Sequence, residues 1–83
     1  MDIELFKTNA PSLCFGRGPD PEMPRTTERI FAERGGSAIE VIAHKDTGKM
    51  YRVLWRKNGG AWNSKANPGE IDIIRILREI FSP

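Results

Sequence analysis

Residues 37–57 carry the pattern that most constrains the fold of this chain. Polar and apolar side chains alternate in both halves, 37–44 and 50–57, and this period of two is typical of strands buried on one face. The stretch 45–48, Lys-Asp-Thr-Gly, ends on glycine, which type I turns favour at their last position. The segment therefore predicts an antiparallel hairpin, and in its first strand the side chains of Ile39, Val41 and Ala43 would point inward.

The second strand of this hairpin has two faces of different character. One face would carry Tyr51, Val53 and Trp55, and the other Met50, Arg52, Leu54 and Arg56. Antiparallel sheets commonly bury one face and leave the other in water. We expect the face with Val53 to be the core, which would bury Trp55 and leave the arginines outside.

Residues 69–81 predict an amphipathic helix. Asn67 would be its N-cap, with proline next and Glu70 two residues further on, a variant of the capping box. Arg75 and Glu79 are spaced as an i, i+4 ion pair. The apolar stripe, which would cover the hairpin, consists of Ile73, Ile74, Leu77, Ile80 and Phe81, widened by Ile71 and Ile76.

Residues 26–34 fit two structures. As a helix, the segment would be capped by Thr26 and ended by Gly35-Gly36. As a strand, it would reach the hairpin through a two-residue turn at the same glycines. The adjacent pair Ile30-Phe31 fits neither period, and we favour the helix.

The remaining segments give weaker signals. Residues 2–6 alternate and predict a brief strand, and residues 61–62 would begin a return strand after a turn at 58–60. Four of the six prolines fall within 8–25, which predicts an irregular segment inside a single domain, 1–83. An apolar island at 13–15 would pin this segment to the core.

These elements predict an α+β fold. A small antiparallel sheet, with its hairpin at about 37–57, would be covered by the C-terminal helix at about 69–81, with an extra helix or strand at 26–34. The alternative is an SH3-like small barrel, which would follow if 26–34 is a strand and the hairpin curls.

Cys14 is the only cysteine, so no internal disulfide can form. The first residues lack the features of a signal peptide, and no apolar run approaches the roughly 20 residues of a membrane span. We therefore expect a cytoplasmic protein with no membrane partner. Because 83 residues bury little surface, a homo-oligomer such as a homodimer is one way to add stability.

No motif indicates catalysis. A nucleophilic site would need Cys14 beside His44, and nothing in their spacing brings them together. With one His and one Cys, a metal site would need carboxylates for its remaining ligands, and Asp46 is the only acidic residue close to His44 in the sequence. Gly16-Arg17-Gly18 resembles a phosphate loop, but the prolines that follow remove amide donors. We expect no enzyme, no metal and no cofactor.

Positive charge is concentrated in residues 45–66, which hold six basic side chains against Asp46 alone, a local charge of +5. Tyr51, Trp55 and Trp62 lie among them, and interfaces are enriched in aromatic residues and arginine. The expected binding residues are Lys45, Lys49, Arg52, Arg56, Lys57, Trp62 and Lys65.

Two kinds of partner fit this basic hairpin. We expect a non-enzymatic module that binds an acidic protein surface, an adaptor, inhibitor or regulator such as phages and mobile elements encode. The alternative is a nucleic-acid-binding domain, since guanidinium groups contact phosphates and exposed aromatic rings stack on bases. Trp55 distinguishes the two, because a buried Trp55 could not stack on a base. A third interpretation is that Arg52 and Arg56 only solvate the outer face of the sheet.

Overall fold

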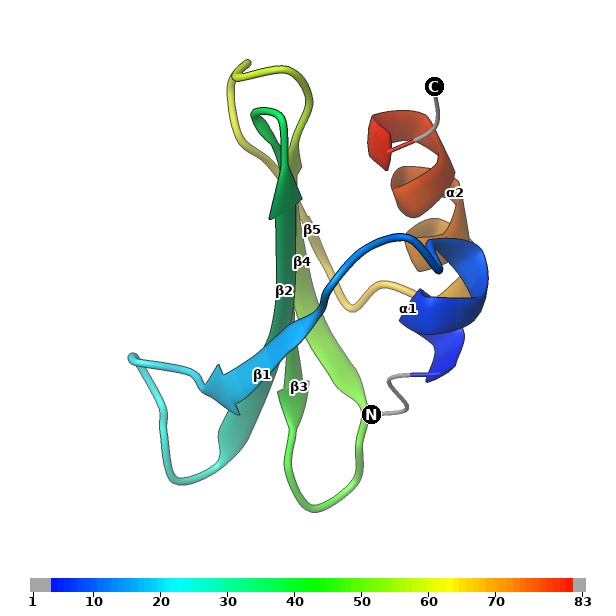
Figure 1. Ribbon diagram of the computed structural model, residues 1–83. Coiled ribbons are helices and arrows are strands. Elements are labelled where there is room, and N and C mark those ends of the chain that lie inside the picture. Colours follow the sequence, from blue (N-terminus) through cyan, green and yellow to red (C-terminus); the bar gives the residue numbers. More distant parts are fainter. Residues whose placement is uncertain (1–3, 82–83) are drawn as a thin grey trace.

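The computed structural model describes residues 4–81, which form one antiparallel sheet and two helices. The sheet has five strands in the order β1-β2-β3-β4-β5, so each strand pairs with its neighbours in sequence. Both helices lie on the same side of the sheet (Figure 1). The helices are α1 (Glu4–Asn9) and α2 (Glu70–Phe81), and the strands are β1 (Gly16–Pro19), β2 (Thr27–Arg34), β3 (Ser37–His44), β4 (Met50–Arg56) and β5 (Asn63–Ala66). The predicted α+β class and its covering C-terminal helix are confirmed.

The sheet is open, and the small-barrel alternative is therefore wrong. β1 and β5 form its two edges, and within residues 4–81 they do not pair with each other. Each edge strand has only four residues. The apolar side chains of one face are buried by the two helices, so this sheet does not need to close on itself.

The core lies between the helices and this covered face. Its fully buried side chains come from α1, from the three central strands and from α2, and they include Phe6, Ile30, Val41, Val53 and Ile73. In the sheet, Val41 stands between Ile30 of β2 and Val53 of β4. These three residues fix which face of each strand points inward.

The predicted hairpin is confirmed as β3 and β4, with a bulge near its turn. Ile42 is paired with Arg52, and Ala43 with Met50, so Tyr51 is the extra residue of β4. As a result Met50 packs against the core, although the alternation placed it on the outer face. Tyr51 is exposed, and its ring meets His44 edge-on with centroids 5.7 Å apart.

The helix favoured for 26–34 is wrong, because these residues form β2. Every residue from Thr27 to Arg34 is paired with β3. Gly35 and Gly36 have φ angles of +59° and +85°, the left-handed conformations that a tight two-residue hairpin turn requires. Cross-strand pairing thus decides the structure of a segment whose own pattern is ambiguous.

The brief strand predicted at the N-terminus is also wrong where the structure describes it. Residues 4–9 form α1, while residues 2 and 3 lie outside the described part of the chain. α1 is fixed by Phe6, which is fully buried and packs against Phe15 at a centroid distance of 5.5 Å.

The proline-rich segment 8–25 contains the end of α1 and the edge strand β1. Leu13 and Phe15 pack against the core as predicted, whereas Cys14 between them is exposed. The loop after β1 is held by Asp20, which is only 4% exposed and accepts a hydrogen bond from the hydroxyl of Thr27 at 3.2 Å.

The helix predicted at 69–81 is confirmed, but its cap differs. Asn67 adopts a φ of +50° in the turn before the helix, and the N–H of Gly69 donates to Asp72 Oδ2 at 2.9 Å. Asp72 Oδ1 also accepts a hydrogen bond from Arg75 at 3.1 Å, an i, i+3 pair in place of the expected Arg75–Glu79 pair. An acidic residue in the first turn suits the positive end of the helix dipole.

The expected return strand after β4 begins at Asn63 instead of residue 61. Asn58 and Gly59, both with positive φ, turn the chain, and residues 61–62 bridge to β5. Trp62 therefore lies just before the first paired residue of β5 and outside the strand.

An ion pair ties the edge strand β1 to β2. The guanidinium of Arg17 donates to both carboxylate oxygens of Glu28, at 3.0 and 3.1 Å. These hydrogen bonds hold the pKa of Glu28 below its ordinary value. A lowered pKa in the folded state contributes stability at neutral pH that is lost as the pH falls and the carboxylate is protonated.

Candidate functional site

The sheet face opposite the helices is uncovered, and we call it the open face. Alternation along the strands places on it every second side chain of β2, β3 and β4, opposite in direction to Ile30, Val41 and Val53. In Figure 1, no helix lies on this side of the sheet. The open face includes Arg29, Phe31, Glu33, Glu40, Ile42, Arg52, Leu54 and Arg56, with Trp62 against Arg56 at its margin.

Strand pairing arranges these side chains in rows across the sheet. In one row Ile42 stands between Arg29 of β2 and Arg52 of β4. Ile42 is only 8% exposed although no helix covers it. Its burial fits the way arginine stems lie along apolar surface while their charged ends remain in water. The centre of the open face is therefore apolar and bordered by guanidinium groups.

Of the three arginines on the open face, one forms an ion pair with a carboxylate and two do not. Arg29 is paired with Glu40 at 3.2 Å, and its guanidinium lies 4.7 Å from the centroid of Phe31. Arg52 and Arg56 have no carboxylate partner among residues 4–81. β4 thus contributes two positive charges that the fold itself does not neutralise.

Arg56 is fixed by an aromatic contact. Its guanidinium lies 5.3 Å from the ring centroid of Trp62, which is 50% exposed. Its Nε is buried and has no hydrogen-bond partner in the described part of the chain. Stacking on an indole is a favourable contact for a guanidinium. This pair forms a flat, half-exposed platform at the margin of the open face.

A small pocket of about 260 Å³ lies on the open face, where the loop after β1 meets the sheet. Its apolar residues are Ile42, Leu54 and Pro21, and its other lining residues carry charges of both signs. Those charged residues are Asp20, Glu22, Arg29, Glu40 and Arg52. A pocket that combines apolar residues with charges of both signs can take an apolar side chain and select its polar neighbours.

Phe31 is placed by a glycine of the edge strand. Gly16 is paired with Phe31, and a Cβ built on Gly16 would lie 2.5 Å from two carbons of the Phe31 ring. The ring therefore covers the bare backbone of β1, a recurrent way to protect an edge glycine. Phe31 remains 38% exposed and offers its outer surface to solvent.

We expect Gly16→Ala to displace the Phe31 ring and to lower the free energy of unfolding by about 1 kcal/mol through lost packing. Gly18→Ala is the matched control, because a Cβ at Gly18 would meet nothing within 4 Å. Ring proton shifts and urea unfolding measure the two effects. Equal responses of the two variants would contradict the placement of Phe31.

The structure brings together three of the seven residues predicted to bind. Arg52, Arg56 and Trp62 share the open face, whereas the four lysines are dispersed. Lys45 and Lys49 lie at the turn between β3 and β4, and Lys57 lies just after β4. Lys65 is paired with Val53 and so points to the helix side.

Sequence reasoning missed the contribution of β2 to this face. The helix favoured for 26–34 would keep Arg29 and Phe31 out of the sheet, and the loop residues Asp20 and Glu22 fall in the segment expected to be irregular. The signal that could have found the first two is Gly35-Gly36, since a two-residue turn aligns 27–34 with 37–44. No comparable signal marks Asp20, whose place depends on its hydrogen bond to Thr27.

Trp55, which was expected to distinguish two kinds of partner, packs against the core. It is paired with Ile39 on the covered face and is partly buried. The stacking platform foreseen for nucleic acid therefore lacks its central residue.

The described residues give less support to metal binding or membrane insertion than to binding at the open face. Within 4–81, no three His, Cys, Asp or Glu side chains gather as metal ligands would. Neither α1 nor α2 is long and apolar enough to cross a membrane. Comparison of the chain with protein-family models, with curated proteins and with solved structures gave no match.

Proposed function

We propose that this protein is a non-enzymatic binding module whose open face binds an acidic surface of another protein. The observation that carries the proposal is the pair Arg52 and Arg56, two charges without carboxylate partners beside the half-buried Leu54. A partner protein with carboxylates at matching positions would form the ion pairs that these two arginines lack. Electrostatic complementarity of this kind fixes register and raises the association rate.

The composition of the open face supports a protein partner. Arginine and aromatic residues dominate the sites that contribute most binding energy in protein interfaces. Arg56 and Trp62 already form a stacked pair, and Phe31 is held over Gly16. Side chains fixed in this way lose little conformational entropy on binding.

The pocket on this face suggests how a partner would be anchored. An apolar side chain of the partner would enter the pocket over Ile42 and Leu54, and neighbouring carboxylates would meet Arg52 and Arg56. The preferred partner segment thus combines a large apolar residue with acidic neighbours.

Nucleic acid fits the same surface less well. Trp55 faces the core, and the basic segment 45–66 divides its lysines between the ends of the hairpin and the other face. The charge that looked continuous in sequence is not continuous in space.

A selection from displayed random peptides tests the proposed function. We expect the bound peptides to be enriched in a large apolar residue flanked by Asp or Glu. Single- and double-stranded DNA and RNA, titrated at two salt concentrations, form the second arm. Nucleic-acid affinity that falls steeply with salt, together with no enriched peptide motif, would overturn the proposal.

We also propose the cytoplasm as the site of action. Cys14 is exposed, and a reducing compartment would keep its thiol free.

A further inference from the structure

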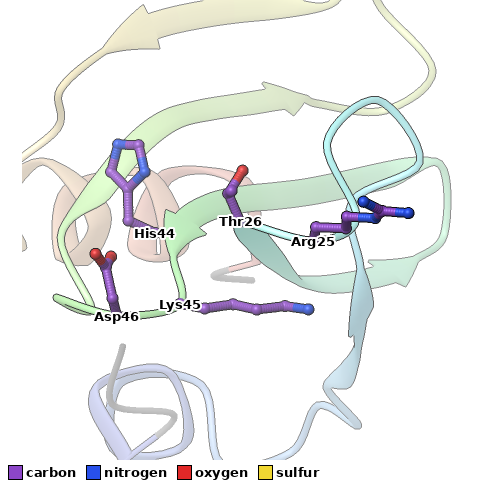
Figure 2. Close-up of a pocket in the computed structure, with 5 residues that line it drawn as sticks. All are labelled: Arg25, Thr26, His44, Lys45 and Asp46. Atoms are coloured by element: carbon purple, nitrogen blue, oxygen red, sulfur yellow. The ribbon is translucent and has the colours of Figure 1, made fainter.

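A second pocket lies at the end of the sheet where β2 begins and β3 ends. It has a volume of about 440 Å³ and forms where the segment before β2 meets the turn after β3. It is lined by Arg25, Thr26, His44, Lys45 and Asp46, drawn in Figure 2. It shares no lining residue with the pocket on the open face.

Backbone contacts hold the two walls of this pocket together. The N–H of Lys45 donates to the carbonyl of Thr26 at 2.9 Å, and Lys45 Nζ donates to the carbonyl of Pro24 at 2.6 Å. The turn itself is closed by the N–H of Gly48, which donates to the carbonyl of His44 at 2.9 Å. The walls are therefore set by the fold before any ligand arrives.

The side chains of this pocket are rich in hydrogen-bond donors. Arg25 makes no hydrogen bond or ion pair within residues 4–81, so its guanidinium is free to bind a ligand. Lys45 has three N–H donors, and one of them goes to Pro24. Thr26 and His44 add a hydroxyl and an imidazole.

The arrangement of these donors leaves one side of the pocket basic. In Figure 2, Arg25 and Lys45 extend to the same side, whereas His44 and Asp46 stand at the other. Asp46 is the only acid of the lining, and its Oδ1 accepts a hydrogen bond from the N–H of Thr47 at 2.9 Å. Arg25 and Lys45 against Asp46 leave the lining with more basic than acidic side chains.

We propose that this pocket binds the phosphoryl group of a phosphate monoester. Arginine grips phosphate through two parallel N–H bonds, and lysine adds a point charge. The volume falls in the range of small-ligand pockets and exceeds what the phosphoryl group alone would fill, so it leaves room for the group that carries the phosphate. That group can be a nucleoside or a phosphorylated side chain, which share this chemistry.

Titration of the isotope-labelled protein with inorganic phosphate, adenosine 5′-monophosphate and a phosphothreonine peptide tests the site. We expect saturable shifts of the backbone amides of Thr26, His44 and Lys45, with one of the two monoesters binding more tightly than phosphate. Sodium acetate is the control for charge alone and should give no saturable shift. Absence of saturation with all three phosphate compounds would overturn the proposal.

Substitution separates a built site from general charge attraction. We expect Arg25→Gln to weaken phosphate binding at least about tenfold, because a charge-assisted hydrogen bond is lost. Arg25→Lys should restore part of it. Lys65→Gln removes the same charge from β5 and should change nothing. Equal losses in Arg25→Gln and Lys65→Gln would contradict the site. These outcomes do not depend on the open face.

Discussion

Replacing Phe6 by alanine is expected to lower the free energy of unfolding by about 3–5 kcal/mol. Phe6 is fully buried between α1 and the rest of the core and contacts Phe15. Its removal takes apolar area out of the core and leaves a cavity that a short helix cannot refill. Because small domains have only about 5–15 kcal/mol in total, this change should bring the protein close to unfolding at ordinary temperatures.

Urea unfolding followed by circular dichroism measures this effect. Lys7→Ala is the matched control in the same helix, because Lys7 is exposed and should change stability by no more than about 0.5 kcal/mol. If Phe6→Ala changes stability as little as the control does, α1 does not dock as described.

Reversing the charges of Arg52 and Arg56 is expected to weaken binding of the selected acidic peptides by at least about a hundredfold, close to 2.7 kcal/mol. Each substitution, Arg52→Glu and Arg56→Glu, turns an attraction into a repulsion at the surface where the peptide lies. Neither guanidinium has an ion pair within residues 4–81, so we expect the fold to persist without the Arg56–Trp62 contact, and circular dichroism of the variant checks this.

The control for this variant changes the net charge equally elsewhere. Lys65→Glu combined with Arg78→Glu alters two exposed residues, one pointing to the helix side from β5 and one on α2. Fluorescence anisotropy of a labelled peptide compares the two variants at one salt concentration. An equal loss of affinity in both would show that overall charge governs binding and that the open face does not.

The elements with strong periodicity could be predicted from the sequence. The period of two in 37–57 extends over several residue pairs, and the apolar stripe of 69–81 extends over several helical turns. Both segments have the predicted structure. The bulge at Tyr51 could not be predicted, because one inserted residue leaves the alternation on either side intact.

The structures of α1 and β2 differ from the ones favoured because both depend on distant contacts. α1 has six residues, too few for a helical period to stand out, and it is held by the burial of Phe6. β2 carries the adjacent residues Ile30 and Phe31, of which one enters the core and the other covers Gly16. Both roles are visible only once β1, β2 and β3 are paired.

The candidate site was predicted only where it lies on one strand. Arg52 and Arg56 share a face of β4, and this followed from alternation alone. Arg29 reaches the same face through the order of strands, because Ile42 of β3 pairs with both Arg29 and Arg52. Tertiary pairing also explains why Lys65, close to Trp62 in sequence, points to the opposite side.

The most direct test of the open face as the binding surface is its footprint under a selected acidic peptide, measured by amide chemical-shift changes. We predict that the largest changes fall on β2, β3 and β4 around Arg29, Ile42 and Leu54, with little change along α2. Changes concentrated on α2 or on the edge of β5, with the open face undisturbed, would contradict the account.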